Sequence, residues 1–176
     1  MRSKLLFILA LLACWASTPA KAEFFSVGLD TPLSHSFTNS DLESDGVSGF
    51  GLQVKFPLMV GLGIEQYDTK IKDSSGSTLA TNLYDIFFQL PVPVINITFG
   101  GGLGTTDFKC TTCGGVEPFK QASTSSAFVQ LGWAILPFFD LHVGMHNTYA
   151  KLEPVDGGDK VDVGGKVTTL GLSFGF

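Results

Sequence analysis

The chain has few charged residues and no continuous apolar stretch long enough for a transmembrane helix. Charged side chains make up 15% of its 176 residues, and the apolar run that starts at Leu5 is interrupted from Ser17 onward. A spanning helix needs about 20 consecutive apolar residues. The sequence therefore excludes a helical inner-membrane protein. It does not exclude a membrane barrel, whose strands need only about 9–11 residues each.

Basic residues are scarce as well. The chain has 11 Lys and Arg against 16 Asp and Glu, which gives a formal net charge of −5. Proteins that bind nucleic acid grip its phosphates with Lys and Arg. We therefore expect no nucleic-acid partner.

Cysteine is limited to three residues, and only Cys110 and Cys113 form a close pair. A structural metal site would need two more soft ligands, and no second Cys-x-x-Cys is present. We therefore predict no metal and no cofactor. In an oxidising compartment the default for such a pair is a disulfide, which would staple one loop.

The N-terminal segment has the features of a secretory signal. Arg2 and Lys4 precede an apolar run, and Ala20-Lys-Ala22 supplies small residues for cleavage before Glu23. We predict a signal peptide at 1–22 and one domain at 23–176. Leu11-Leu-Ala-Cys14 resembles a lipoprotein lipobox, which leaves lipidation of Cys14 as an alternative, although Leu12 fits that motif poorly.

Glycine and phenylalanine, by contrast, are abundant, with 21 and 16 residues. The end of the chain shows how they are arranged. Leu170, Leu172, Phe174 and Phe176 fall on one side of an extended strand, whereas Gly171, Ser173 and Gly175 fall on the other. Apolar side chains toward lipid and small or polar ones toward a lumen are typical of a transmembrane β-strand.

The same period of two runs through eight segments. We predict strands at 23–37, 47–56, 59–70, 80–90, 94–108, 124–135, 138–151 and 164–176. Short turns containing proline follow the second, fourth and sixth strands, and longer polar segments form the other connections. This alternation predicts an all-β fold, an eight-stranded antiparallel up-and-down transmembrane β-barrel.

Alternation alone does not say which face points inward, because a soluble lipocalin-type barrel would enclose its apolar face. Volume favours the opposite arrangement. The interior of an eight-stranded barrel is just wide enough for side chains to fill, and the apolar set is almost wholly bulky, whereas the polar set is rich in glycine. We therefore expect the apolar face to meet lipid.

From Glu23 to Phe176 the sequence resembles the small eight-stranded outer-membrane barrels, namely the OmpA membrane domain, OmpW and the opacity-type surface proteins. The locally specific part of the likeness is the ending Leu-Gly-Leu-Ser-Phe-Gly-Phe176. The resemblance implies location in the cell outer membrane, contact with its lipid and lipopolysaccharide, and recognition of Leu170, Leu172, Phe174 and Phe176 by the barrel-assembly machinery. A monomer is the expected state.

Seven ionisable residues fall on the face predicted to point inward. They are Asp30, Lys55, Glu65, Asp85, Asp140, His142 and His146. Buried charges must be paired, so we predict a polar network centred on Lys55 that fills the lumen. His142 and His146 lie about 13 Å apart at ~3.3 Å per residue, too far to share a metal.

These features favour a non-enzymatic outer-membrane barrel with a filled polar lumen and four external loops, acting in envelope integrity or surface interaction. One alternative is an OmpW-like passage for small hydrophobic molecules, which needs a gap in strand pairing and an apolar inner pocket. Another is a lipid A deacylase similar to PagL, whose His-x-Ser pair would correspond to His146 and Thr148. Threonine departs from that motif, and no carboxylate is evidently placed to orient the histidine.

Overall fold

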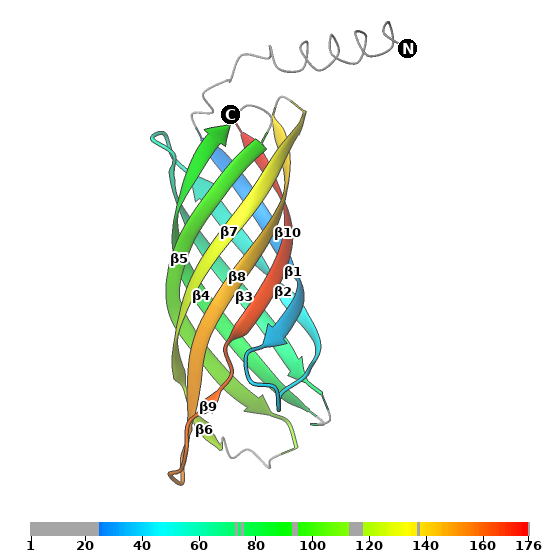
Figure 1. The fold of residues 1–176 in the computed structure, drawn as a ribbon, viewed down its shortest axis with the longest axis vertical. Coiled ribbons are helices and arrows are strands. Elements are labelled where there is room, and N and C mark those ends of the chain that lie inside the picture. Colours follow the sequence, from blue (N-terminus) through cyan, green and yellow to red (C-terminus); the bar gives the residue numbers. More distant parts are fainter. Residues whose placement is uncertain are drawn as a thin grey trace, which may run out of the picture.

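Eight long antiparallel strands close into a barrel, as the sequence predicts (Figure 1). In the computed structural model they are β1 (Ser26–Phe37), β2 (Ser44–Lys55), β3 (Val60–Ile71), β4 (Ser77–Val92), β5 (Ile95–Cys110), β7 (Ala122–Leu136), β8 (Phe139–Pro154) and β10 (Gly165–Gly175). β10 pairs with both β1 and β8, which closes the ring. Each strand follows its neighbour in the chain, so the topology is an up-and-down meander.

The structure describes residues 25–72, 74, 76–92, 95–112, 118–136 and 138–175. The predicted signal peptide, 1–22, lies outside these ranges, as do Cys113 and Phe176. The described part of the chain contains no helix that is long and apolar enough to cross a membrane.

The two ends of the barrel differ. The three short connections lie at one end together with the C-terminus, and the long connections lie at the other (Figure 1). We call these the turn end and the loop end. Two short strands that the sequence did not predict, β6 (Phe119–Lys120) and β9 (Val161–Asp162), pair with β8 at the loop end and extend the wall there.

The apolar face points outward, as predicted. Phe50, Leu131 and Leu172 are all exposed, with 51%, 44% and 38% of their surface accessible. Glycines on the opposite face make room for the few large rings inside: a Cβ added at Gly61 would lie 2.0 Å from Cζ of Phe87. The lumen is therefore crowded, and the bulky apolar residues had no space within it.

One seam interrupts the wall. β1 and β2 pair only from Ser26–Lys55 to Asp30–Gly51. Beyond that point β1 follows β10 as far as Phe37, and β2 follows β3 as far as Ser44. Residues 31–37 and 44–50, all of them described, therefore face each other across the seam without ladder pairs. A bulge at Pro32–Ser34 marks the start of the separation.

The loop half of the barrel has an apolar interior. Its buried members are Leu79, Ala122, Ala150, Leu152 and Val163. Phe37, Leu42, Ile71, Phe108, Phe119 and Val161 pack against them, partly buried. The lumen thus has two parts, a polar one toward the turn end and an apolar one toward the loop end.

Candidate functional site

The turn half of the lumen encloses one small cavity. Its volume is about 30 Å³, which has room for one or two water molecules. Polar residues from seven strands line it, among them Gln53, Lys55, Gln89, Asn96 and Asp140. The side chains that line the cavity therefore leave little open space in this part of the lumen.

Two carboxylate–histidine pairs lie deeper in the lumen. Asp30 Oδ1 is 2.5 Å from His142 Nε2, and Glu65 Oε1 is 3.1 Å from His146 Nδ1. All four residues are buried. The His146 ring also stacks on Phe128, with the ring centroids 4.6 Å apart and the planes 13° from parallel. β1 and β3 supply the carboxylates, and β8 supplies both histidines.

The other predicted lumen residues also have partners. Asn96 Nδ2 donates to Asp140 Oδ2 at 2.6 Å, and Ser126 Oγ donates to Asp85 Oδ1 at 3.2 Å. Lys55 lines the turn-end cavity, at the edge of this set, and is only partly buried. The printed contacts of the lumen include two carboxylate–histidine pairs, and Lys55 lines the cavity beside Asp140 and His142. The prediction that the network is centred on Lys55 stays a prediction.

The Thr148 hydroxyl, which the sequence pattern places near His146, contacts the backbone of β10. Thr148 Oγ1 donates to the Gly165 carbonyl at 3.2 Å and accepts from the Gly165 amide at 3.1 Å. The hydroxyl is therefore engaged in joining β8 to β10. Sequence reasoning missed that Glu65 lies against His146, because the alternating pattern identifies the inward face but not the neighbours across the lumen.

Replacing Thr148 with Ala should lower the free energy of unfolding by about 1–3 kcal/mol, because the buried Gly165 amide loses its acceptor. Lipid A acylation in cells should stay unchanged. Thr148→Ser is the matched control, since it keeps the hydroxyl and also completes the His-x-Ser pattern. Mass spectrometry that found deacylated lipid A with either the parent or this control would contradict the structural role.

Two further polar clusters were not predicted. The hydroxyls of Thr81, Thr106 and Thr124 form a chain across β4, β5 and β7, with oxygen separations of 3.0 and 2.7 Å. His35 Nδ1 lies 2.9 Å from Thr69 Oγ1. His35 was missed because the bulge at Pro32–Ser34 changes the register of β1 just before it.

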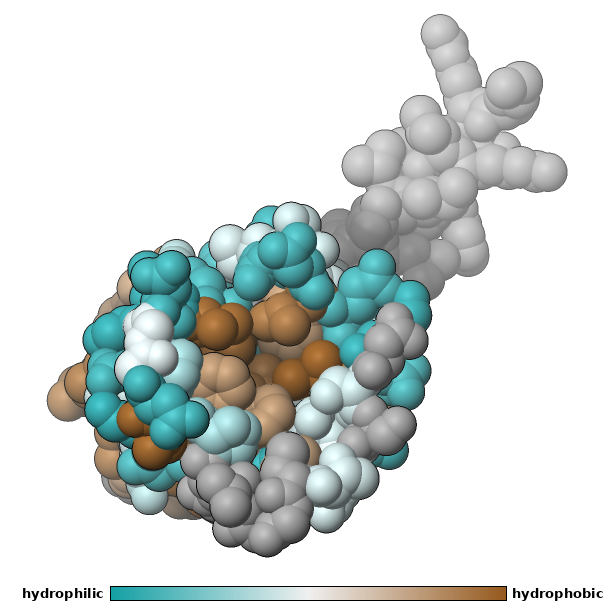
Figure 2. Space-filling view, turned by 90° about the horizontal axis from the view of Figure 1, so that it is seen from below, coloured by the Kyte–Doolittle hydropathy of each residue, from teal (hydrophilic) through white to brown (hydrophobic). Residues whose placement is uncertain are grey.

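The loop-end mouth combines a hydrophilic rim with an apolar interior. Viewed from this end, the molecule is hollowed, and hydrophobic side chains line the hollow (Figure 2). The apolar cluster around Leu79 and Leu152 lies in this half of the barrel. An apolar pocket of this kind suits a hydrophobic ligand or side chain.

Ion pairs connect residues of the loops and strand ends around the mouth. Lys72 Nζ pairs with Glu43, and Lys120 and Lys160 both pair with Glu153, at 2.7 and 3.2 Å. The hydrogen bond from Lys72, and the positive charge of the same group, lower the pKa of Glu43. Hydrogen bonds from Lys120 and Lys160 lower the pKa of Glu153 in the same way.

The third loop begins at Cys110, which is disulfide-bonded. Its predicted partner, Cys113, lies outside the described residues, so the Cys110–Cys113 pairing stays a prediction. No group of three or more His, Cys, Asp or Glu residues in the described ranges is arranged to hold a metal.

The predicted assembly signal falls on β10. Leu172 and Phe174 are exposed on the outer wall, and Leu170 is half-buried there. Phe174 packs edge-to-face on Phe139 of β8, with ring centroids 4.8 Å apart. Recognition of this strand by the assembly machinery remains a prediction.

Comparison with known proteins identifies the fold. No protein-family model and no curated protein sequence matches the chain. The crystal structure of Neisserial surface protein A is similar, with a TM-score of 0.61 and 13% identity, and the match covers 86% of this chain and 97% of that one. The solution structure of the Escherichia coli outer membrane protein W is also similar, with a TM-score of 0.56, 13% identity and coverage of 88% and 98%. The protein therefore has the fold of the small eight-stranded outer-membrane β-barrels.

Proposed function

We propose that the protein is a non-enzymatic integral barrel of the outer membrane that is closed along its axis and acts at its loop end, in envelope integrity or surface interaction. The packed polar lumen, with a cavity of only about 30 Å³, is the observation that carries the proposal. The outward apolar wall fits a lipid environment. Outer-membrane lipid, lipopolysaccharide and the barrel-assembly machinery are the proposed partners.

Planar bilayer recordings test the closed axis. The purified protein should insert without producing unitary current steps, because the paired side chains leave no continuous water path. A change of electrophoretic migration on heating would show that the inserted material is folded. Steps of constant size from folded protein would contradict the proposal.

A second candidate function is lateral transfer of small hydrophobic molecules. Two observations favour it, namely the apolar mouth and the seam between residues 31–37 and 44–50. A molecule that entered the mouth would find the axis blocked below it by the polar lumen. The seam would offer it a sideways exit toward the outer leaflet.

Closing the seam tests this candidate. Thr31 and Phe50 are the next positions after the last paired residues, Asp30 and Gly51, in an unchanged register. A disulfide between cysteines at these two positions should lower uptake of a hydrophobic fluorescent probe by about tenfold if the seam is the exit. The single variants and the reduced double variant serve as controls. Equal uptake by the oxidised and reduced forms would exclude the lateral route.

A further inference from the structure

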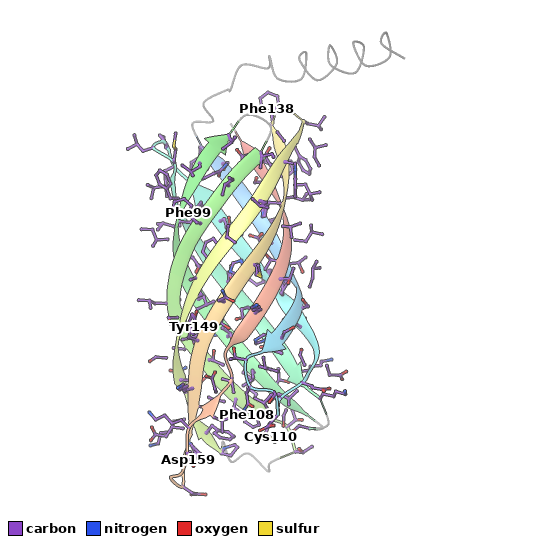
Figure 3. All side chains as sticks on the ribbon, in the orientation of Figure 1. Phe99, Phe108, Cys110, Phe138, Tyr149 and Asp159 are labelled. Carbon is purple, nitrogen blue, oxygen red and sulfur yellow. The ribbon has the colours of Figure 1, made fainter. Side chains whose placement is uncertain are left out.

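The three turns at the turn end are apolar. Their most exposed residues are Leu58, Met59, Val92, Leu136 and Phe138, which we call the turn rim. Leu58 has 88% of its surface accessible and Leu136 has 62%. The described residues of the three turns include no charged side chain. Figure 3 shows Phe138 at this end of the barrel and Asp159 at the opposite tip.

The outward apolar wall is short along the barrel axis. From Phe50 on β2 to Phe56, the residue after its end, it measures ~20 Å along the strand at ~3.3 Å per residue and ~15 Å along the axis at a ~40° tilt. On β5 it is taller and runs from Ile95 to Leu103, or ~20 Å by the same conversion. The apolar band of outer-membrane barrels is about 25 Å tall.

The missing height can be supplied only at the turn end. On the loop side, polar residues occupy the next outward position of each of several strands, including Gln66 on β3, Asn147 on β8 and Thr168 on β10. On the turn side, the outward positions that the structure describes include no charged residue, and the wall continues into the turn rim. The turn rim is thus an extension of the lipid-facing surface.

The first turn is also conformationally unfavourable for the residues it contains. Leu58 and Met59 have φ values of 79° and 66°, in the left-handed region where Gly, Asn and Asp are preferred. The loop has three residues, 57–59, and such loops usually have Gly at the left-handed position. Two large apolar side chains therefore occupy positions where small polar residues would fold more easily, which indicates a use for their apolar surface.

We propose that the turn rim is embedded in phospholipid of the inner leaflet, so that the barrel is anchored by its turns as well as by its wall. This inference rests on the proposed membrane location. Inner-leaflet phospholipid is the occupant because the turn rim is continuous with the lipid-facing wall and makes up its missing height. The aqueous surface of the protein is then concentrated at the loop end.

A bimane label on Leu58→Cys, in the full mature chain folded into phospholipid vesicles, tests the proposal. The same label on Leu172→Cys, on the outer wall, reports a side chain in contact with lipid. On Val155→Cys, at the loop end, it reports an exposed apolar position in water, since Val155 is 53% exposed. Brominated phospholipid should quench the label at position 58 within about twofold of the label at 172. The label at 155 should keep its fluorescence.

The outcomes separate this inference from the proposed function. If the label at 172 is quenched and the label at 58 behaves like that at 155, the turn rim lies in water and only the inference is wrong. If the label at 172 is also unquenched, the membrane location fails. A label at 58 that is shielded from aqueous iodide but not quenched by brominated lipid would show a second copy or a protein partner on the turn rim, which also overturns the inference.

A second variant removes the apolar turn without straining the backbone. Leu58→Asn combined with Met59→Gly suits the left-handed φ values and should fold. Trp133, on the outer wall of β7 near the turn end, reports the depth of the barrel through its quenching by lipids brominated at different carbons. We expect quenching of Trp133 to shift toward the shallower bromines. An unchanged depth profile would count against anchoring by the turn rim.

Discussion

His142→Ala should lower the free energy of unfolding by about 1–3 kcal/mol, because the buried Asp30 side chain loses its hydrogen-bond partner. His142 Nε2 lies 2.5 Å from Asp30 Oδ1, and both side chains are almost fully buried. The substitution leaves a carboxylate in the lumen without its nearest partner. Urea unfolding from phospholipid vesicles, followed by the emission of Trp133, measures the effect.

Two controls locate the effect in the pair. Asp30→Asn in the His142→Ala background should recover part of the lost stability, because the neutral amide leaves no unpaired charge in the lumen. Lys120→Ala breaks an ion pair at the exposed loop end, where solvent screens both groups, and should leave the unfolding midpoint nearly unchanged. A His142→Ala effect no larger than that of Lys120→Ala would contradict the role of the buried pair.

The strands and their faces could be predicted because lipid imposes a simple rule. On β8, Leu141, Val143 and Met145 alternate with His142 and His146, and both the strand and its orientation follow from that pattern. Proline located the turn after β2, but the predicted strand end at 90 was wrong, because β4 continues through Pro91, which pairs with Asn96. The orientation followed from volume, since an interior that accommodates Gly61 beside Phe87 has no room for rows of Leu and Phe.

The apolar mouth was not predicted, because the type of residue that points inward changes from polar to apolar along a strand while the alternation continues. On β8 beyond Thr148 the inward residues become apolar, Ala150 and Leu152, while Lys151 points outward. Outside the bilayer the wall faces water, and the apolar residues therefore turn inward as in a soluble barrel. A single rule applied from end to end of each strand cannot find this reversal.

The contacts between side chains across the lumen could not be predicted from the sequence either. Alternation shows that Glu65 and His146 share the interior, but their contact depends on how far each hairpin is staggered around the ring. The seam has a similar origin. Its start coincides with the bulge in β1 at Pro32–Ser34. Pro32 indicates an irregularity in the strand, but it does not show that β1 separates from β2 rather than from β10.

Phe87→Ala should destabilise the barrel by about 3 kcal/mol or more, the range found for large-to-small substitutions of buried aromatic residues. Phe87 is 4% exposed, fills the space opposite Gly61 and lies edge-on to Phe128 at a centroid distance of 6.5 Å. Phe88 is the control on the same strand, because its ring lies on the outer wall against Phe99. Phe88→Ala should cost less, since lipid can fill the space that its ring leaves.

A double-mutant cycle with Gly61 makes the prediction specific to the packing. In the parent, Gly61→Ala places a methyl group 2.0 Å from the Phe87 ring and should destabilise by about 1–3 kcal/mol through overpacking. In the Phe87→Ala background the same methyl group enters vacated space, so Gly61→Ala should be neutral or stabilising. The coupling between the two sites should reach about 1–3 kcal/mol, as for residues in direct contact. Additive effects in vesicle unfolding would show that Phe87 does not occupy the space beside Gly61, and the description of the lumen as closed by packing would lose its main support.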